Sequence, residues 1–167
     1  HQCENGGNNQ LNRFSLADFR NRYHVIMDMK AKKSLGQNFL RDRTIIERIV
    51  STAGVQRTDR IFEIGPGTGV LTQALSGTGA SVLAIEIDSR LVERLNEIFV
   101  QSESVSILEG NILDMNLEEL LIHAGYEYQS YKVVANIPYY ITAPIIRTLL
   151  SLRSQASLII LMVQNEV

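Results

Sequence analysis

Three glycines follow a short apolar run near the middle of the chain, in the segment Glu63-Ile-Gly-Pro-Gly-Thr-Gly69. Glycine lacks a Cβ, so it permits a tight turn and a close approach of a ligand to the backbone. In open α/β sheets, ligands bind beyond the carboxyl ends of the strands. A glycine turn without a ligand would have the same composition, so this segment by itself is weak evidence for a site.

A carboxylate at the end of the next apolar run makes the prediction more specific. Glu86 lies roughly twenty residues after Gly65, the interval at which an acid accepts hydrogen bonds from the ribose hydroxyls of a nucleoside. A strand-end carboxylate facing water is the structural alternative. Asp88 is a competing candidate, but we expect it to cap the helix that begins near Ser89.

The glycine spacing distinguishes between two nucleoside ligands. A nicotinamide dinucleotide site requires the pattern G-x-G-x-x-G, whereas this chain has Val70 at the last position and a glycine one residue earlier, Gly69. That arrangement fits a mononucleoside without a pyrophosphate. S-adenosylmethionine (SAM) is such a ligand, so we predict a SAM site.

The segment Asn136-Ile-Pro-Tyr139 follows a later apolar run and contains groups that suit methylation of an exocyclic base amine. The lone pair of such an amine is delocalised into the ring, which makes the amine a weak nucleophile. An enzyme can turn the lone pair toward the methyl donor by accepting hydrogen bonds from both N–H groups. Asn136 offers a side-chain oxygen and Pro138 a backbone carbonyl. Tyr139 offers a ring for stacking an extruded base, worth ~1–3 kcal/mol. A turn with a buried aromatic ring is the alternative.

Alternating apolar runs and helical patterns must position these residues. Continuous apolar strands are typical of a parallel sheet covered by helices on both faces, which predicts the α/β class. We expect residues 1–10 to be disordered and residues 11–29 to form one short helix. The chain stops directly after the last predicted strand, so we expect an incomplete domain. The predicted strands are 59–64, 81–87, 105–109, 131–135 and 158–163; the predicted helices are a segment around 45–50, then 70–75, 89–100, 117–124 and 143–152.

Composition excludes several classes of protein. The chain has 167 residues, 45% of them hydrophobic and 20% charged, as in one globular domain. Its longest apolar stretch, Ser157–Val163, is far shorter than the ~20 residues that cross a bilayer. No secretion leader opens the chain, so we expect a cytoplasmic protein that does not bind membranes. The single cysteine, Cys3, excludes a disulfide framework, and the three histidines lack metal-ligand spacing.

The net charge of −2 conceals an asymmetry along the chain. Residues 1–43 contain eight Lys or Arg and four Asp or Glu, whereas residues 44–167 contain eight basic and fourteen acidic residues. A basic N-terminal segment on an acidic body permits contact with a polyanion. We expect Lys30–Arg43 to contact RNA phosphates.

Four segments carry a further signal: Lys33-Ser-Leu-Gly-Gln-Asn-Phe-Leu40, Glu63–Gly69, Ala84-Ile-Glu-Ile-Asp88 and Asn136–Tyr139. Together they resemble a known family, the adenine N6-dimethyltransferases of small-subunit ribosomal RNA, over residues 30–167. The resemblance implies a Rossmann-like fold of SAM-dependent methyltransferases, with a mostly parallel sheet and helices on both faces. It implies a SAM-binding domain at 30–167 after an extension at 1–29.

The resemblance also implies roles for individual residues. The N-terminal segment contacts SAM, the glycine loop backs its methionine part, and Asn136 lies between the cofactor and the target base. Where the family has Gly-Asp to accept a bond from the adenine amino group of SAM, this chain has Gly110-Asn111, and Asp114 is three residues away. We carry the role to Asn111. The expected cofactor-binding residues are Asn38, Leu40, Gly65, Gly67, Glu86, Asn111 and Asn136; the expected catalytic residues are Asn136, Pro138 and Tyr139.

The implied function is dimethylation of N6 of two adjacent adenosines near the 3′ end of 16S rRNA, by direct displacement without a metal. The implied partner of the monomeric enzyme is small-subunit rRNA or a pre-30S particle. The family continues beyond Val167 into further strands and a helical RNA-binding domain, so we expect this chain to be inactive alone. Two alternatives remain open: a large-subunit rRNA adenine N6-methyltransferase of the antibiotic-resistance type, and a non-catalytic ribosome-assembly factor.

Overall fold

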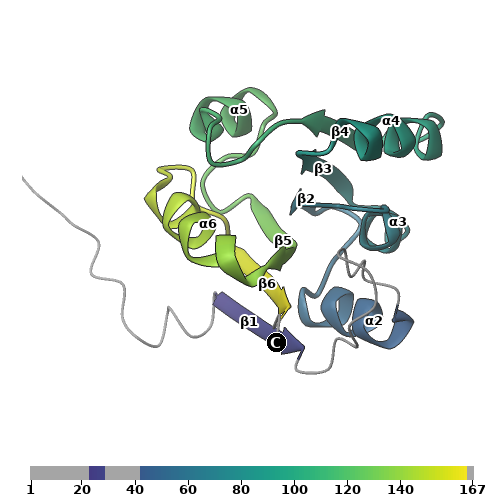
Figure 1. Cartoon of the computed structure of the whole chain (residues 1–167), viewed down its shortest axis with the longest axis horizontal. Coiled ribbons are helices and arrows are strands. Elements are labelled where there is room, and N and C mark those ends of the chain that lie inside the picture. Colours follow the sequence, from purple (N-terminus) through teal and green to yellow (C-terminus); the bar gives the residue numbers. More distant parts are fainter. Residues whose placement is uncertain (1–22, 29–41, 165–167) are drawn as a thin grey trace, which may run out of the picture.

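A single parallel sheet forms the centre of the protein (Figure 1). The computed structural model describes residues 23–28 and 42–164. Its six strands lie in the order β1-β6-β5-β2-β3-β4, and every neighbouring pair is parallel, as the sequence predicts for at least most of the sheet. The strands are β1 (Tyr23–Asp28), β2 (Arg60–Ile64), β3 (Ser81–Glu86), β4 (Val105–Glu109), β5 (Tyr131–Pro138) and β6 (Leu158–Gln164).

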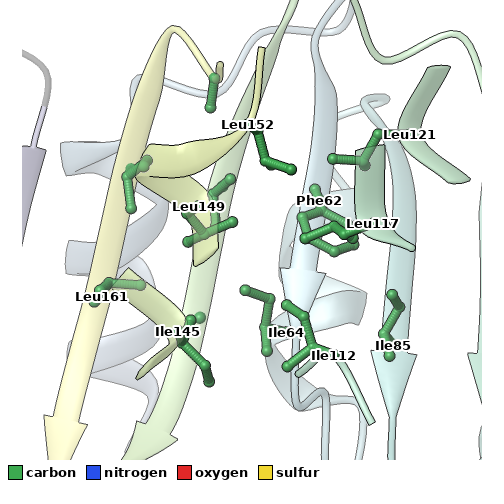
Figure 2. Close-up of a cluster of buried hydrophobic side chains, with 14 of the residues drawn as sticks. Phe62, Ile64, Ile85, Ile112, Leu117, Leu121, Ile145, Leu149, Leu152 and Leu161 are labelled. Atoms are coloured by element: carbon green, nitrogen blue, oxygen red, sulfur yellow. The ribbon is translucent and has the colours of Figure 1, made fainter. Parts of the chain in front are cut away.

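Helices cover both faces of the sheet, with α2, α3 and α4 on one side and α5 and α6 on the other (Figure 1). Each face has its own buried apolar cluster, which is why the central strands are apolar on both sides. In Figure 2, Leu117 and Leu121 of α5 lie close to Phe62 of β2, and Leu149 of α6 belongs to the same buried cluster. The helices are α2 (Arg43–Thr52), α3 (Val70–Ser76), α4 (Ser89–Ile98), α5 (Leu117–His123) and α6 (Tyr139–Ser151).

Strand β1 corrects one prediction. Tyr23–Asp28 was expected to belong to a short helix, but it pairs in parallel with β6 at the edge of the sheet. Val25 and Ile26 are β-branched and Tyr23 is aromatic, so these residues favour an extended backbone. The neighbouring strand β6 supplies that backbone with hydrogen-bond partners. The remaining predictions for 1–22 and for residue 29 lie outside the described residues.

The end of β5 also differs from the predicted pattern. The strand continues through Pro138, because its pairing with β6 extends as far as Pro138 and Gln164. Helix α6 starts directly afterwards at Tyr139 and contains Pro144, whereas the sequence placed the helix start beside that proline. Proline favours the first turn of a helix, which explains why the sequence predicted a helix start several residues after the observed one. Asn136 is consequently held in a strand and not in a loop.

Candidate functional site

The carboxyl ends of four neighbouring strands bring the predicted site residues into one row. The amide of Gly65, after β2, donates to the carbonyl of Ile85 in β3 at 2.9 Å. The amide of Gly110, after β4, donates to the carbonyl of Glu86 at 2.9 Å. On the other side, a Cβ on Gly65 would lie 3.7 Å from the carbonyl oxygen of Asn136 in β5. The order along the edge is therefore Asn136, Gly65, Glu86 and the Gly110-Asn111 turn.

The three glycines of the loop after β2 all adopt the left-handed backbone conformation. The φ angles of Gly65, Gly67 and Gly69 are 68°, 58° and 82°. A Cβ at Gly69 would also lie 2.6 Å from Cδ2 of Leu95 in α4, whereas one at Gly65 would meet only ordinary contacts. Gly69 is thus required by the packing of α3 against α4, and Gly65 by its backbone conformation.

Glu86 is the buried acid at this edge, with 6% of its surface exposed. Its Oε2 accepts a hydrogen bond from the amide of Gly67 at 3.0 Å. Its Oε1 accepts from the amides of Ile87 and Asp88 at 2.8 and 3.0 Å. An ionised carboxylate has about four acceptor positions, so these three bonds leave room for a further donor.

Asp88 has the capping role that the sequence predicts. Its Oδ1 accepts from the amide of Arg90 at 3.0 Å, at the start of α4. The guanidinium of Arg90 also donates to both carboxylate oxygens, and this hydrogen bonding lowers the pKa of Asp88. Asp88 is thereby occupied locally, which leaves Glu86 as the candidate for a ligand hydroxyl.

Glu63 is a second buried acid, to which the sequence analysis assigned no role of its own. It is 1% exposed. Because it lies two residues after Ile61 in β2, both side chains point to the sheet face covered by α2 and α3. Burial raises its pKa to about 8, and the charge of Glu86 adds to this rise. Within the described part of the chain, Oε2 of Glu63 and the hydroxyl of Thr72 have no partner at hydrogen-bond geometry. An acid inside an otherwise apolar strand was the available signal.

Asn111 is held in a local turn after β4. Its Oδ1 accepts from the amide of Leu113 at 3.1 Å, and its Nδ2 donates to Oδ2 of Asp114 at 2.6 Å. Ile112, which lies between Asn111 and Leu113 in the sequence, is 6% exposed and lies beside Ile64 and Ile85 in the apolar cluster (Figure 2). The backbone of the turn is therefore anchored in the core.

The candidate catalytic segment spans the junction between β5 and α6. Asn136 is half-buried. It lies two residues after Val134 in β5, so its side chain points to the same sheet face as those of Val134 and Glu63. The carbonyl of Pro138 accepts a hydrogen bond from the hydroxyl of Thr142 at 3.0 Å, so one of its lone pairs is already used. Tyr139 is the first residue of α6. Asn38 and Leu40 lie outside the described residues.

Two exposed apolar side chains at this edge escaped the sequence analysis. Ile87, directly after Glu86, is 67% exposed, and Leu113, after Asn111, is 39% exposed. The sequence pattern read Ile87 as a strand residue, although it lies one position beyond the end of β3. An apolar residue directly after a strand-end acid was the signal. These side chains provide apolar surface next to the row of polar groups.

In 23–28 and 42–164, no group of three or more His, Cys, Asp or Glu residues is arranged to hold a metal ion. No helix in these ranges is long and apolar enough to span a bilayer.

Comparisons with solved structures identify the fold. The crystal structure of the 23S rRNA methyltransferase ErmE aligns with this chain at 31% identity and a TM-score of 0.58. The aligned part covers 71% of this chain and 45% of the ErmE chain. A dimethyladenosine transferase from Plasmodium falciparum matches 71% of this chain and 40% of its own, with 27% identity and a TM-score of 0.59. The fold is the Rossmann-like methyltransferase fold that the sequence predicts.

Sequence comparisons identify the family. The family model described as ribosomal RNA adenine dimethylase matches residues 28–167. The ribosomal RNA small subunit methyltransferase A of Geobacter sulfurreducens is 43% identical over 139 residues, which cover 83% of this chain and 50% of the relative. The chain thus spans about half the length of the curated relatives that it matches. It belongs to the ribosomal RNA adenine dimethylase family.

Proposed function

We propose that this chain carries the SAM-binding part of an enzyme that dimethylates N6 of two adjacent adenosines near the 3′ end of small-subunit rRNA. The observation that carries the proposal is the row of Asn136, Gly65, Glu86 and Asn111 along the carboxyl edge of one parallel sheet. The names of its relatives support the activity and the choice of rRNA.

The residues at this edge fit SAM by their chemistry. The glycine loop offers a backbone free of side chains for the methionine part, and Glu86 has an acceptor position left for a ribose hydroxyl. The exposed side chains of Ile87 and Leu113 offer apolar surface for the adenine ring. Asn111 offers an oxygen for the adenine amino group. From the sequence, Asn38 and Leu40 of the N-terminal segment complete the site.

When bound, SAM supplies an electrophilic methyl group on its sulfonium sulfur. The side-chain oxygen of Asn136 accepts an N–H of the target amine and turns the nitrogen lone pair toward that methyl group. The carbonyl of Pro138 is the second acceptor, although it shares its oxygen with the Thr142 hydroxyl. The ring of Tyr139 stacks on the extruded adenine. The proton of the methylated amine leaves through solvent, and the reaction requires no metal.

The substrate is small-subunit rRNA within a pre-30S particle, and the enzyme works as a cytoplasmic monomer. The basic segment Lys30–Arg43 supports contact with RNA phosphates. The alternative is methylation of large-subunit rRNA, which the likeness to ErmE at 31% identity favours. The small-subunit relatives are more similar, at 43% identity for the Geobacter sulfurreducens protein, and favour the first substrate.

The test uses the intact protein and SAM with a deuterated methyl group. Unmethylated small-subunit particles and large-subunit rRNA are incubated separately, and the nucleosides are analysed by mass spectrometry. We expect labelled N6,N6-dimethyladenosine from the small-subunit particles, and none when SAM is omitted. Label in large-subunit rRNA alone would identify the alternative substrate. Binding to particles without label in either RNA would identify a non-catalytic assembly factor and contradict the proposal.

A further inference from the structure

The turn after β4 fixes which end of the Asn111 amide is the acceptor. The amide of Leu113 is a donor and lies 3.1 Å from Oδ1. The carboxylate of Asp114 accepts only, and its Oδ2 lies 2.6 Å from Nδ2. Rotating the Asn111 amide by half a turn would place its NH₂ group against the Leu113 amide and its oxygen against the Asp114 carboxylate. Both contacts therefore favour the same orientation.

The backbone that carries this amide has little freedom. Ile112 is buried in the apolar cluster, and the amide of Gly110 is bonded to Glu86 at the end of β3. Asp114 is exposed at the surface of the turn. Its contact with Asn111 thus adjusts a side-chain orientation and does not hold the fold together.

The orientation matters because an amide can read either kind of purine. Adenine presents an amino donor at C6, whereas hypoxanthine presents a carbonyl acceptor at the same position. A carboxylate at position 111 would accept only, but an asparagine that rotates can serve both bases. The chain has an asparagine here together with a neighbouring acid that removes this ambiguity.

We propose that Asp114 is a positioning residue that holds the oxygen of Asn111 toward the ligand, and so makes the site select adenine over a 6-oxopurine. The inference rests on the proposed function, since it assumes that Asn111 faces the base of SAM. Oδ1 keeps one lone pair for the adenine amino group after accepting from Leu113. The charge on Asp114 strengthens the bond that holds Nδ2 away from the ligand.

The test compares S-adenosylhomocysteine with S-inosylhomocysteine, which differ at C6 and in the protonation of N1. Both lack the sulfonium charge, so the charge of Asp114 affects their affinities alike. Calorimetry on the intact protein gives the ratio of the two dissociation constants. We expect the unsubstituted protein to prefer the adenosyl ligand by roughly tenfold to a hundredfold.

Two single variants separate orientation from structure. Asp114→Ala removes the acceptor of Nδ2 and leaves only the Leu113 amide to orient Asn111, so we expect the preference to fall by roughly tenfold while thermal stability changes little. Asp114→Asn keeps an acceptor of the same shape for Nδ2, so we expect it to retain most of the preference. The double variant N111D/D114N replaces the amide at 111 with a carboxylate that needs no orientation, and we expect it to restore the full preference.

The outcomes distinguish this inference from the function on which it rests. If S-adenosylhomocysteine binds and Asp114→Ala keeps the original preference, Asp114 has no positioning role. Equal losses in Asp114→Ala and Asp114→Asn would also contradict the inference, because the orientation would then not depend on an acceptor at 114. If the unsubstituted protein binds neither ligand, the proposed SAM site itself is wrong.

Discussion

The carboxylate of Glu86 accepts a hydrogen bond of 3.0 Å from the amide of Gly67, which joins the end of β3 to the loop after β2. The acid proposed to hold the ribose of SAM therefore also shapes the glycine loop proposed to face its methionine part. Because the same carboxylate accepts from Ile87 and Asp88, it organises the start of the next turn as well. Binding and local structure depend on one buried side chain.

Substituting Glu86 is expected to weaken ligand binding and to lower stability together. In Glu86→Gln, one carboxylate oxygen becomes an NH₂ group, so either the Gly67 amide or the two following amides lose their acceptor. We expect the affinity for S-adenosylhomocysteine to fall by ~1.5–3 kcal/mol, together with a lower melting temperature. Calorimetry and thermal unfolding measure the two effects. An unchanged affinity would remove Glu86 from the site.

Lys132 provides a matched control at the edge formed by the amino ends of the strands, opposite to the candidate site. Its Nζ donates to Oδ2 of Asp59 at 2.6 Å and to the carbonyl of Gly54 at 2.9 Å, near the amino ends of β5 and β2. Lys132→Met is expected to lower the free energy of unfolding by about 1–2 kcal/mol, because both acceptors lose a charged donor. Since this edge is remote from the site, the affinity for S-adenosylhomocysteine should stay unchanged. A matching loss of affinity would mean that binding simply follows global stability.

The glycines of the loop are expected to respond differently to alanine. Gly65→Ala places a side chain at a positive φ, at a cost of about 1–2 kcal/mol, without a close contact. Gly69→Ala adds an overlap with the buried side chain of Leu95, for a further ~1–3 kcal/mol. Urea unfolding should therefore show the larger loss for Gly69→Ala. Calorimetry should show the larger loss of affinity for S-adenosylhomocysteine in Gly65→Ala, since Gly65 is the one proposed to face the ligand. The reverse pattern would exchange the two roles.

Glu63 predicts how stability depends on pH. Its pKa of about 8 in the folded protein exceeds the ordinary value of 4.5, so the folded state keeps a proton that the unfolded chain releases between these pH values. The free energy of unfolding should consequently decrease from about pH 5 to pH 8, with a slope of up to ~1.4 kcal/mol per pH unit from this group. Glu63→Gln, which stays neutral, should flatten that decrease in urea titrations across this range. Equal slopes in the two proteins would show that Glu63 is ionised in the folded state.

The central fold follows from local pattern, because both faces of the parallel strands are buried. The strands around Phe62, Leu83 and Val133 are apolar on both sides, and the turns between elements are marked by glycines. Two features depended on pairing between distant segments and escaped prediction. Tyr23–Asp28 pairs as a strand with β6, and β5 pairs with β6 as far as Pro138.

The candidate site was predictable in its positions and less so in its contacts. Strand-end placement indicated Gly65, Glu86 and Asn136, and the family resemblance indicated Asn111. The structure brings these four residues to one edge. The hydrogen bond between Asn111 and Asp114 depends on the conformation of the four-residue turn from Asn111 to Asp114, which composition does not specify. Burial likewise decides the protonation of Glu63.

The most direct test of the account separates ligand binding from methyl transfer at Asn136. The measurement is single-turnover methylation of small-subunit particles by the intact protein and its Asn136→Ala variant, with SAM affinity determined in parallel. We predict a transfer rate lower by about a hundredfold to a thousandfold, because the amide oxygen acts mainly on the amine in the transition state, and a much smaller change in SAM affinity. Transfer at the normal rate by Asn136→Ala would contradict the assignment of the end of β5 as the place of methyl transfer.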